Sequence, residues 1–341
     1  MRLVDLRSDT LTMPSPDMRR AMYEAELGDD VFGEDPTVNR LQEVAAERMG
    51  KEAALFISSG TMGNLLGLLV NARSGQEVIC DAESHVFLNE GGGAAALGGI
   101  QLRPLPPRRG LLTPEQVEAA LRPTDDDHQP ITAAVSLEDT HNREGGVCWP
   151  LEALQAVFRT ARGHGVKVHL DGARIYNAAV ATGTDPKEIA AVADTLTFCL
   201  SKGLGCPIGS VFCGSHDDVE RGRRWRKMLG GGTREAGVLA AAGLYALEHM
   251  VDRLADDHAN ARTLAEGLSE IDGVGCDLSR VETNIVFIHL ERMRAPEFID
   301  ECGKRGLKID GGEHRIRMVT HFGIESEDVQ YALKVVSEVV A

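Results

Sequence analysis

The chain has 341 residues and carries 52 acidic against 36 basic side chains, which gives a formal net charge of −16. Its length predicts about two domains, and 43% hydrophobic with 26% charged residues is typical of a globular protein. The negative charge and the 4% share of aromatic residues argue against a nucleic-acid partner, because such partners require a basic face or stacking rings.

The sequence also argues against a membrane or secreted protein. The longest apolar stretch, around residues 237–247, is interrupted by glycine and is too short to span a bilayer. No continuous apolar core follows Met1, so we expect no secretory leader. The seven cysteines are scattered without a C-x-x-C pair, and we expect neither a metal site nor a disulfide framework. A cytoplasmic protein with reduced thiols is therefore expected.

Along the chain, the first clear element is a helix that begins after Asp35, has Pro36 in its first turn and ends at Gly50. A second helix start is marked by Thr113 and Gln116, which match a capping box. Strand-like apolar segments alternate with helical segments at 62–72, 113–121 and 151–162. The expected strands are 53–57, 77–80, 100–103, 133–138, 166–171, 195–200 and 209–213. This alternation predicts a parallel α/β sheet.

The pattern changes after residue 232. Residues 235–270 predict one long helix, rich in Ala and Leu. We expect a compact α+β unit beyond it, and we place a domain boundary inside the long helix: 1–245 for an N-terminal arm and a large α/β domain, and 246–341 for a small C-terminal domain. The elements expected in the small domain are a strand at 284–290, a helix at 296–304, two short strands around 307–310 and 315–319, and a last helix that ends at residue 340.

Two of the predicted strands end beside side chains of opposite charge. Asp171 stands at the carboxyl end of its strand, where ligands bind in open α/β sheets, and Lys202 follows another strand 31 residues later. Pyridoxal phosphate requires such a pair, because a lysine forms its Schiff base and an aspartate keeps its pyridine nitrogen protonated. Each residue alone also fits a surface lysine or an ordinary strand-end aspartate, but the pair favours the cofactor.

A phosphate site and a histidine accompany this pair. Ser59, Gly60 and Thr61 open an apolar helix directly after a strand, where free backbone amides suit a phosphate, although a plain helix cap fits equally well. No G-K-[ST] follows, so the turn is not a Walker motif. His85 follows the strand 77–80, where an imidazole can stack on a cofactor ring or move a proton; a lone histidine is more often structural.

Seven motifs then occur in one order: DLRSDT (5–10), GDDV with GEDP (28–36), SGTMGN (59–64), DGAR (171–174), LSKG (200–203), KMLGGG (227–232) and RxRxVTH (315–321). With them the chain resembles the L-threonine aldolase family (low-specificity and L-allo-threonine aldolases) over essentially its whole length. The resemblance implies an α/β fold of the fold-type I, PLP-dependent transferase-like class. It implies a large domain with a mostly parallel seven-stranded sheet between helices, plus a small C-terminal α+β domain.

The resemblance also implies how a pyridoxal 5'-phosphate cofactor is held. Lys202 carries it, Asp171 pairs with its pyridine nitrogen, and His85 stacks on its ring. The remaining expected cofactor contacts are Gly60, Thr61, Arg174 and Arg234, the last reaching the phosphate of a neighbouring subunit.

For the substrate, the resemblance implies that Ser8, Arg174 and Arg317 bind the carboxylate, since a guanidinium meets a carboxylate with two parallel bonds. His128 is expected near the substrate hydroxyl. The implied reaction is retro-aldol cleavage of L-threonine, L-allo-threonine and related β-hydroxy-α-amino acids to glycine and an aldehyde, through the Lys202 Schiff base and a quinonoid intermediate. The base stays open between His85, His128 and an activated water.

Other questions stay open at this point. The chain departs from the family's pattern at Phe32, Phe87–Asn89 and Asp139, which leaves the preference between threonine, allo-threonine and larger β-hydroxy amino acids undecided. An aminotransferase is the first alternative within the cofactor class, and a non-catalytic ligand-binding protein is the alternative outside it. The resemblance implies a homotetramer, a dimer of dimers with shared active sites, with small-molecule partners and neither nucleic acid nor membrane.

Overall fold

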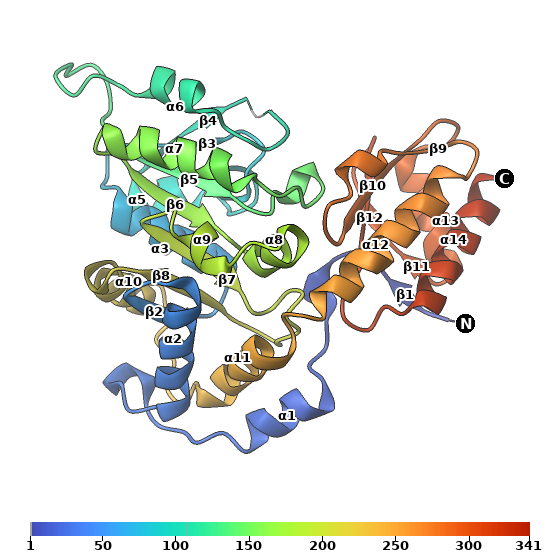
Figure 1. The fold of residues 1–341 in the computed structure, drawn as a ribbon, viewed down its shortest axis with the longest axis horizontal. Helices are drawn as coiled ribbons and strands as arrows, with labels where there is room; N and C mark the ends of the chain where they lie inside the picture. The colour runs from blue at the N-terminus through green and yellow to red at the C-terminus, as the bar shows by residue number, and fades with distance from the viewer. Residues whose placement is uncertain (1, 107) are drawn as a thin grey trace.

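A seven-stranded sheet forms the centre of the larger of two lobes in the computed structural model, which describes residues 2–106 and 108–341 (Figure 1). Four neighbouring pairs are parallel, and β8 alone runs antiparallel to both of its neighbours, because no crossover helix joins it to β7. In spatial order the strands are β2 (Ala53–Ile57), β8 (Ser210–Gly214), β7 (Thr195–Cys199), β6 (Lys167–Asp171), β5 (Thr132–Glu138), β3 (Glu77–Asp81) and β4 (Gln101–Leu105).

All seven strands predicted from the sequence are confirmed, with ends that move by no more than two residues. The expected α/β class with a mostly parallel sheet is therefore confirmed as well. Apolar side chains fill both faces of the strands: Ala54 and Phe56 belong to one core cluster, whereas Leu55 and Ile57 belong to another on the opposite face.

Helices cover both faces of this sheet (Figure 1). On one face lie α3, α5 and α10, and on the other lie α2, α7, α8 and α9. The helices of the larger lobe are α1 (Pro16–Tyr23), α2 (Pro36–Met49), α3 (Gly60–Asn71), α4 (His85–Leu88), α5 (Gly93–Gly98), α6 (Pro114–Ala120), α7 (Leu151–Gly163), α8 (Ile175–Thr182), α9 (Pro186–Ala190), α10 (His216–Met228) and α11 (Gly237–His249).

The predicted helix ends are confirmed by their capping bonds. Asp35 accepts from the second and third amides of α2, and Gly50 ends that helix in the left-handed conformation at a φ of 61°. Thr113 and Gln116 form the reciprocal bonds of a capping box at the start of α6. These ends depend on local bonds, which explains why the sequence alone predicts them.

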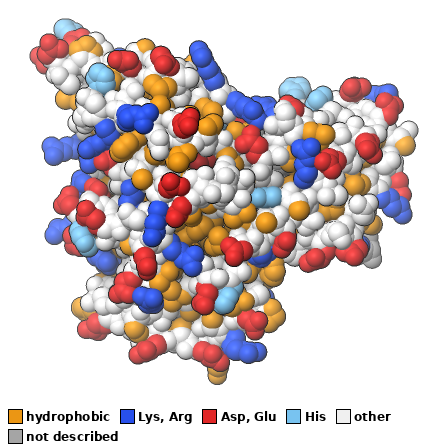
Figure 2. Space-filling model, viewed as in Figure 1, with side chains coloured by type: hydrophobic (Ala, Val, Ile, Leu, Met, Phe, Trp, Pro, Cys, Tyr) orange, Lys and Arg blue, Asp and Glu red, His pale blue; other side chains and the backbone are white. Residues whose placement is uncertain are grey.

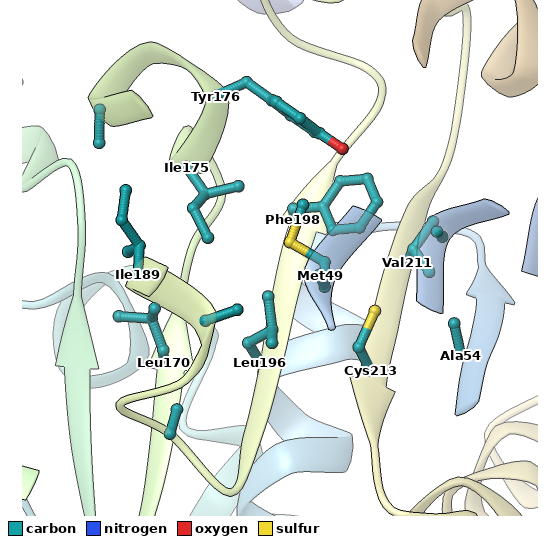
Figure 3. Close-up of a cluster of buried hydrophobic side chains, with 14 of the residues drawn as sticks. Met49, Ala54, Leu170, Ile175, Tyr176, Ile189, Leu196, Phe198, Val211 and Cys213 are labelled. Atoms are coloured by element: carbon teal, nitrogen blue, oxygen red, sulfur yellow. The ribbon is translucent and has the colours of Figure 1, made fainter. Parts of the chain in front are cut away.

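Buried side chains hold the ends of the central strands in place (Figure 3). The ring of Tyr176, on α8, meets Phe198 of β7 edge to face with 5.5 Å between ring centroids. Leu170 and Leu196 lie beside each other on the adjacent strands β6 and β7 and are fully buried (Figure 3). This packing fixes the two strands whose ends lead to the predicted cofactor residues.

The prediction of one helix over 235–270 is wrong. The segment contains two helices, α11 and α12 (Leu254–Ser269), separated by a turn at 250–253. Ala240 and Leu247 of α11 pack into the core of the larger lobe, whereas Leu264 and Leu268 of α12 pack into that of the smaller lobe. The chain must therefore change direction between two cores, and no glycine or proline marks this turn in the sequence.

The smaller lobe contains an antiparallel sheet, and the N-terminal strand β1 (Val4–Asp5) joins this lobe by pairing in parallel with β11 (Leu307–Lys308). Both chain ends lie on this lobe (Figure 1). Its sheet order is β12 (Asp310–Gly311), β13 (Ile316–Val319), β10 (Ile285–Leu290) and β9 (Val274–Cys276), and its helices are α12, α13 (Ala295–Lys304) and α14 (Ser326–Val340).

The core of the larger lobe extends to Leu254, and the core of the smaller lobe includes Leu6 and starts again at Ala261. The domain boundary at 245/246 stays a prediction. None of the helices in residues 2–106 and 108–341 combines the length and apolar character needed to cross a membrane.

Candidate active site

The carboxyl ends of β7, β6, β5 and β3 meet at one edge of the larger sheet. Asp171 ends β6, His85 begins α4 shortly after β3, and Lys202 lies in the loop after β7. The three groups are close enough that the charges of Asp171 and Lys202 both act on the pKa of His85, although its hydrogen bond to Glu90 has the largest effect. The structure therefore brings these predicted residues together where ligands bind in such sheets.

Asp171 is buried, and both of its carboxylate oxygens accept hydrogen bonds. Oδ1 accepts from the Ala173 amide at 3.0 Å, and Oδ2 accepts from the Asn64 side chain at 2.7 Å. Asn64 is in turn contacted by His169, whose Nε2 lies 3.2 Å from Asn64 Oδ1. Burial lowers the pKa of His169 to about 4, so its ring is neutral and can donate to Asn64 while accepting from Thr195. Asp171 is thus held in one orientation.

His85 is paired with an acid. Its Nδ1 lies 2.8 Å from Glu90 Oε1, and this hydrogen bond raises the pKa of His85 above its ordinary value against the opposing effect of burial. Burial also raises the pKa of Glu90. The backbone amide of His85 donates to buried Glu138 at 2.6 Å, which fixes the start of α4. The pair can therefore hold a proton beside Asp171 and Lys202.

His85, Glu90 and Asp171 also place three possible metal-ligand atoms within 4.8 Å of one another. The Asn64 amide donates to Glu90 at 2.8 Å and to Asp171 at 2.7 Å, and His85 bonds to Glu90 as well. Both carboxylates therefore already accept hydrogen bonds from side chains of the chain.

The start of α3 has the features of a phosphate site. Ser59 Oγ accepts from the Met62 amide at 3.2 Å, while the amides of Gly60 and Thr61 belong to the first turn, where helix geometry supplies no acceptor. A Cβ atom on Gly60 would lie 2.7 Å from Cys199 Sγ, so the helix start is pressed against β7. A residue without a side chain is needed here to keep this edge open.

Arg174 is largely occupied by an acid in the N-terminal arm. Its Nε and Nη2 donate to the two oxygens of Asp9 at 2.7 and 2.8 Å, and both side chains are buried. Burial opposes ionisation of Asp9, but the Arg174 guanidinium holds its pKa well below the usual range. Arg174 and Arg317 both donate to Asn142 Oδ1 at 3.2 Å. Of the two arginines predicted to bind the substrate carboxylate, Arg317 keeps a buried Nε that has no partner among the described residues.

Ser8 lies next to Arg317 along the arm. Arg317 Nη2 donates to the carbonyl of Arg7 at 3.0 Å. Ser8 Oγ accepts from the amide and the hydroxyl of Thr10 at 3.2 and 2.9 Å, so its own proton is free for another acceptor. Ser8 and Arg317 therefore present unused donors of the kind that a carboxylate requires.

A cavity of about 570 Å³ adjoins these groups. It lies between the two lobes, because its walls come from α4 and the segment after β5 on one side and from β10, β12 and β13 on the other. The lining residues are His85, Asn89, Asn142, Arg143, Phe287, Asp310, Gly311, Gly312, His314, Arg315 and Arg317.

Two predicted residues do not reach this site within the single chain. His128 lies in the loop before β5, at the opposite end of that strand from the site, is 96% exposed and contacts Asp126. Arg234 is about half exposed and pairs with Asp29 at 2.8 Å. Their roles in the site stay predictions.

Four residues of the site were missed from the sequence. Asn64 and Asp9 belong to two of the seven motifs, SGTMGN and DLRSDT, but the sequence alone assigns them no role in the site. Glu90 and Asn142 follow no spacing rule, because they reach the site through short turns after α4 and β5. Only the folded chain places them against His85 and the two arginines.

Comparison with known proteins gives consistent results. Residues 5–292 match the beta-eliminating lyase family. The chain is 45% identical to the probable low-specificity L-threonine aldolase 2 of Arabidopsis thaliana, over 98% of this chain and 96% of that one. It is 44% identical to the low specificity L-threonine aldolase of Escherichia coli K12, over 96% of both. The fold matches a threonine aldolase structure from Leishmania major with a TM-score of 0.85 at 21% identity, over 98% and 99% of the two chains.

Proposed function

The chain belongs to the beta-eliminating lyase family and, within it, to the low-specificity L-threonine aldolases, and from this membership we propose that it cleaves L-threonine and L-allo-threonine to glycine and acetaldehyde. The observation that carries the proposal is the convergence of Lys202, Asp171 and Arg317 on one edge of the sheet, with Ser8 and His85 beside them.

We propose pyridoxal phosphate as the cofactor. When bound, it supplies a ring that accepts the electron pair of the breaking Cα–Cβ bond. Lys202 would hold its aldehyde carbon, Asp171 its pyridine nitrogen and the start of α3 its phosphate. Two observations support the fit: Asp171 is buried and oriented by donors on both oxygens, and the first amides of α3 have no acceptor within the helix, at a glycine where a Cβ would lie 2.7 Å from Cys199 Sγ.

Side chains of the protein bind the substrate and take up its proton. Arg317 binds the substrate carboxylate through its Nε, which has no partner among the described residues, and Ser8 binds it through its free hydroxyl proton. Asn142 and Arg174 hold Arg317 in place, since Asn142 accepts from both guanidinium groups. We infer that His85 takes the β-hydroxyl proton, because Glu90 stabilises the charge that the imidazole gains.

We also propose the assembly and the compartment. A homotetramer with shared active sites would bring Arg234 and His128 of one subunit to the site of another, and both side chains are exposed. The seven cysteines are free, and six of them are buried, which is in keeping with a reducing cytoplasm.

Replacing Lys202 by alanine tests the proposed reaction. We expect the wild-type enzyme, supplied with pyridoxal phosphate, to release acetaldehyde from L-threonine, and we expect K202A to lose this activity by several orders of magnitude. Borohydride reduction followed by peptide mass spectrometry should place the pyridoxyl group on Lys202. The control is K304A, because Lys304 is an exposed residue of α13. Full activity of K202A would contradict the proposal.

A further inference from the structure

The cavity beside the site extends past the predicted carboxylate ligand into a second cationic surface. Its inner wall contains His85, Asn142 and Arg317, and its outer wall contains Arg143 and Arg315. Figure 2 shows Lys, Arg and His side chains side by side along the upper edge of the junction between the two lobes.

Phe287 lies beside both arginines of the small lobe. Arg317 is opposite Phe287 of β10 and opposite Asp310 of β12. Arg315 directly precedes β13 and stands two residues before Arg317. The Arg315 guanidinium stacks on the Phe287 ring at 3.4 Å from the ring centroid. Phe287 thus holds the second cation at a set distance from the first.

Both arginines reach across to the same turn of the larger lobe. Arg317 donates to the Asn142 side chain at 3.2 Å, and Arg315 donates to the Arg143 carbonyl at 2.7 Å. The two guanidinium groups therefore lie along one wall of the cavity as two successive anion-binding positions.

Arg315 is the cation of this outer wall that has no acid partner. Arg143 pairs with Glu83 at 2.7 Å, whereas no carboxylate in residues 2–106 and 108–341 lies within ion-pair distance of Arg315. One face of its guanidinium is covered by Phe287, so part of its hydration is already lost. An arriving carboxylate would meet a positioned and unpaired guanidinium.

We propose that Arg143, Phe287 and Arg315, termed the Arg315 subsite, bind a second carboxylate at the far end of the substrate. This proposal rests on the proposed function and deepens it: among β-hydroxy-α-amino acids of equal length, the enzyme prefers those with a side-chain carboxylate. The test case is a five-carbon substrate, because it carries one carboxylate for Arg317 and a second at its far end for Arg315.

The reaction with such a substrate balances without any further reagent. In 3-hydroxy-L-glutamate the Cα–Cβ bond breaks, the β-hydroxyl loses its proton, and Cβ becomes an aldehyde carbon. The electron pair stays on Cα, which takes up a proton. The products are glycine and 3-oxopropanoate, whose carboxylate is the group that the Arg315 subsite held.

The test compares 3-hydroxy-L-glutamate with 3-hydroxy-L-glutamine, which has the same shape without the charge. We expect kcat/KM for the acid to exceed that for the amide by about tenfold or more, and we expect R315Q to reduce this ratio to about 1. R315Q should change kcat/KM for L-threonine by less than about threefold, and R315K should restore part of the ratio. The control is R292Q, because Arg292 is an exposed residue outside the cavity.

A binding measurement separates this inference from the proposed function. L-glutamate and L-glutamine lack the β-hydroxyl, and calorimetry should show tighter binding of glutamate to the holoenzyme, with the difference lost in R315Q. Absence of threonine cleavage would refute the proposed function alone. The Arg315 subsite would be refuted if the wild type gave equal kcat/KM values for 3-hydroxy-L-glutamate and 3-hydroxy-L-glutamine. It would also be refuted if R315Q lowered kcat/KM by the same factor for every substrate.

Discussion

At the scale of single residues, a line of hydrogen bonds reaches Asp171 along the interface between α3 and the sheet. Asn71 donates to Thr195 Oγ1 at 2.7 Å, which leaves the Thr195 hydroxyl proton for Nδ1 of His169, 3.0 Å away. The neutral His169 then donates to Asn64, which donates to Asp171. Each group has one consistent role, so the carboxylate orientation is set by buried neighbours and needs no ligand.

The pairing of His85 with Glu90 gives a prediction about proton affinity. Because the hydrogen bond that His85 donates to Glu90 is the main cause of the raised pKa of His85, replacing the acid by its amide should lower that pKa. E90Q removes the charge that stabilises the imidazolium and keeps the size of the side chain. The imidazole resonance, followed by NMR against pH and assigned with H85N, should titrate at lower pH in E90Q than in the wild type.

The matched control for this titration is E83Q. Glu83 lies in the same segment but pairs with Arg143 and makes no bond to His85. Its replacement should leave the His85 titration unchanged. A His85 pKa that is the same in E90Q and the wild type would show that Glu90 does not set it.

At the scale of elements, the close contact between α3 and the sheet gives a second prediction. An added methyl group at Gly60 would lie 2.7 Å from Cys199 Sγ, so G60A should push the helix start away from β7. Overpacking of this kind costs roughly 1–3 kcal/mol. G60A should therefore unfold at lower urea concentration and bind pyridoxal phosphate more weakly in a fluorescence titration.

Shortening the opposing side chain supplies the control. C199A removes the sulfur that the new methyl group meets, so the double variant G60A/C199A should recover cofactor affinity relative to G60A. If the double variant binds as weakly as G60A, the contact with Cys199 is not the cause of the weaker binding.

The elements also show what a single sequence can and cannot predict. Strands and caps were predicted well, because Asp35, Gly50 and Thr113 act through bonds within a few residues of themselves. The turn at 250–253 was missed, because it follows from the need to serve two separate cores and not from local chemistry. Lys202 and Asp171 could be found because each follows a strand that the sequence predicts. Partners such as Glu90 could not, because their positions depend on how the chain folds after the strand.

At the scale of the whole molecule, Asp9 joins three parts of the chain. It lies in the arm between β1 and α1, pairs with Arg174 beyond β6 of the larger lobe, and accepts from Asn284 of the smaller lobe at 3.4 Å. Asn284 also donates to the Thr320 carbonyl at 3.0 Å. A buried ion pair therefore connects both lobes directly beside the site.

This junction gives a prediction about stability and pH. The pKa of Asp9 is depressed in the folded state, where burial is outweighed by Arg174. An acid whose pKa is lowered by folding stabilises the fold fully above its unfolded pKa of about 3.9. This contribution is lost as the pH falls from there towards the pKa of the folded state. D9N leaves Arg174 buried without a counter-charge, so it should lower the free energy of unfolding by roughly 3–5 kcal/mol at neutral pH.

Urea unfolding of the holoenzyme at about pH 7 and about pH 3 measures this effect, because the gap between wild type and D9N should narrow at the lower pH. The control is D5N in the same arm, where Asp5 pairs with an exposed arginine, Arg7, and removal of an exposed pair changes stability little. Asp9 also orients Arg174 beside Arg317, so D9N should raise KM for L-threonine more than D5N does. A gap between D9N and wild type that is the same at both pH values would show that the Asp9 carboxylate is not held ionised by Arg174, and the ion pair would then not be what couples the two lobes.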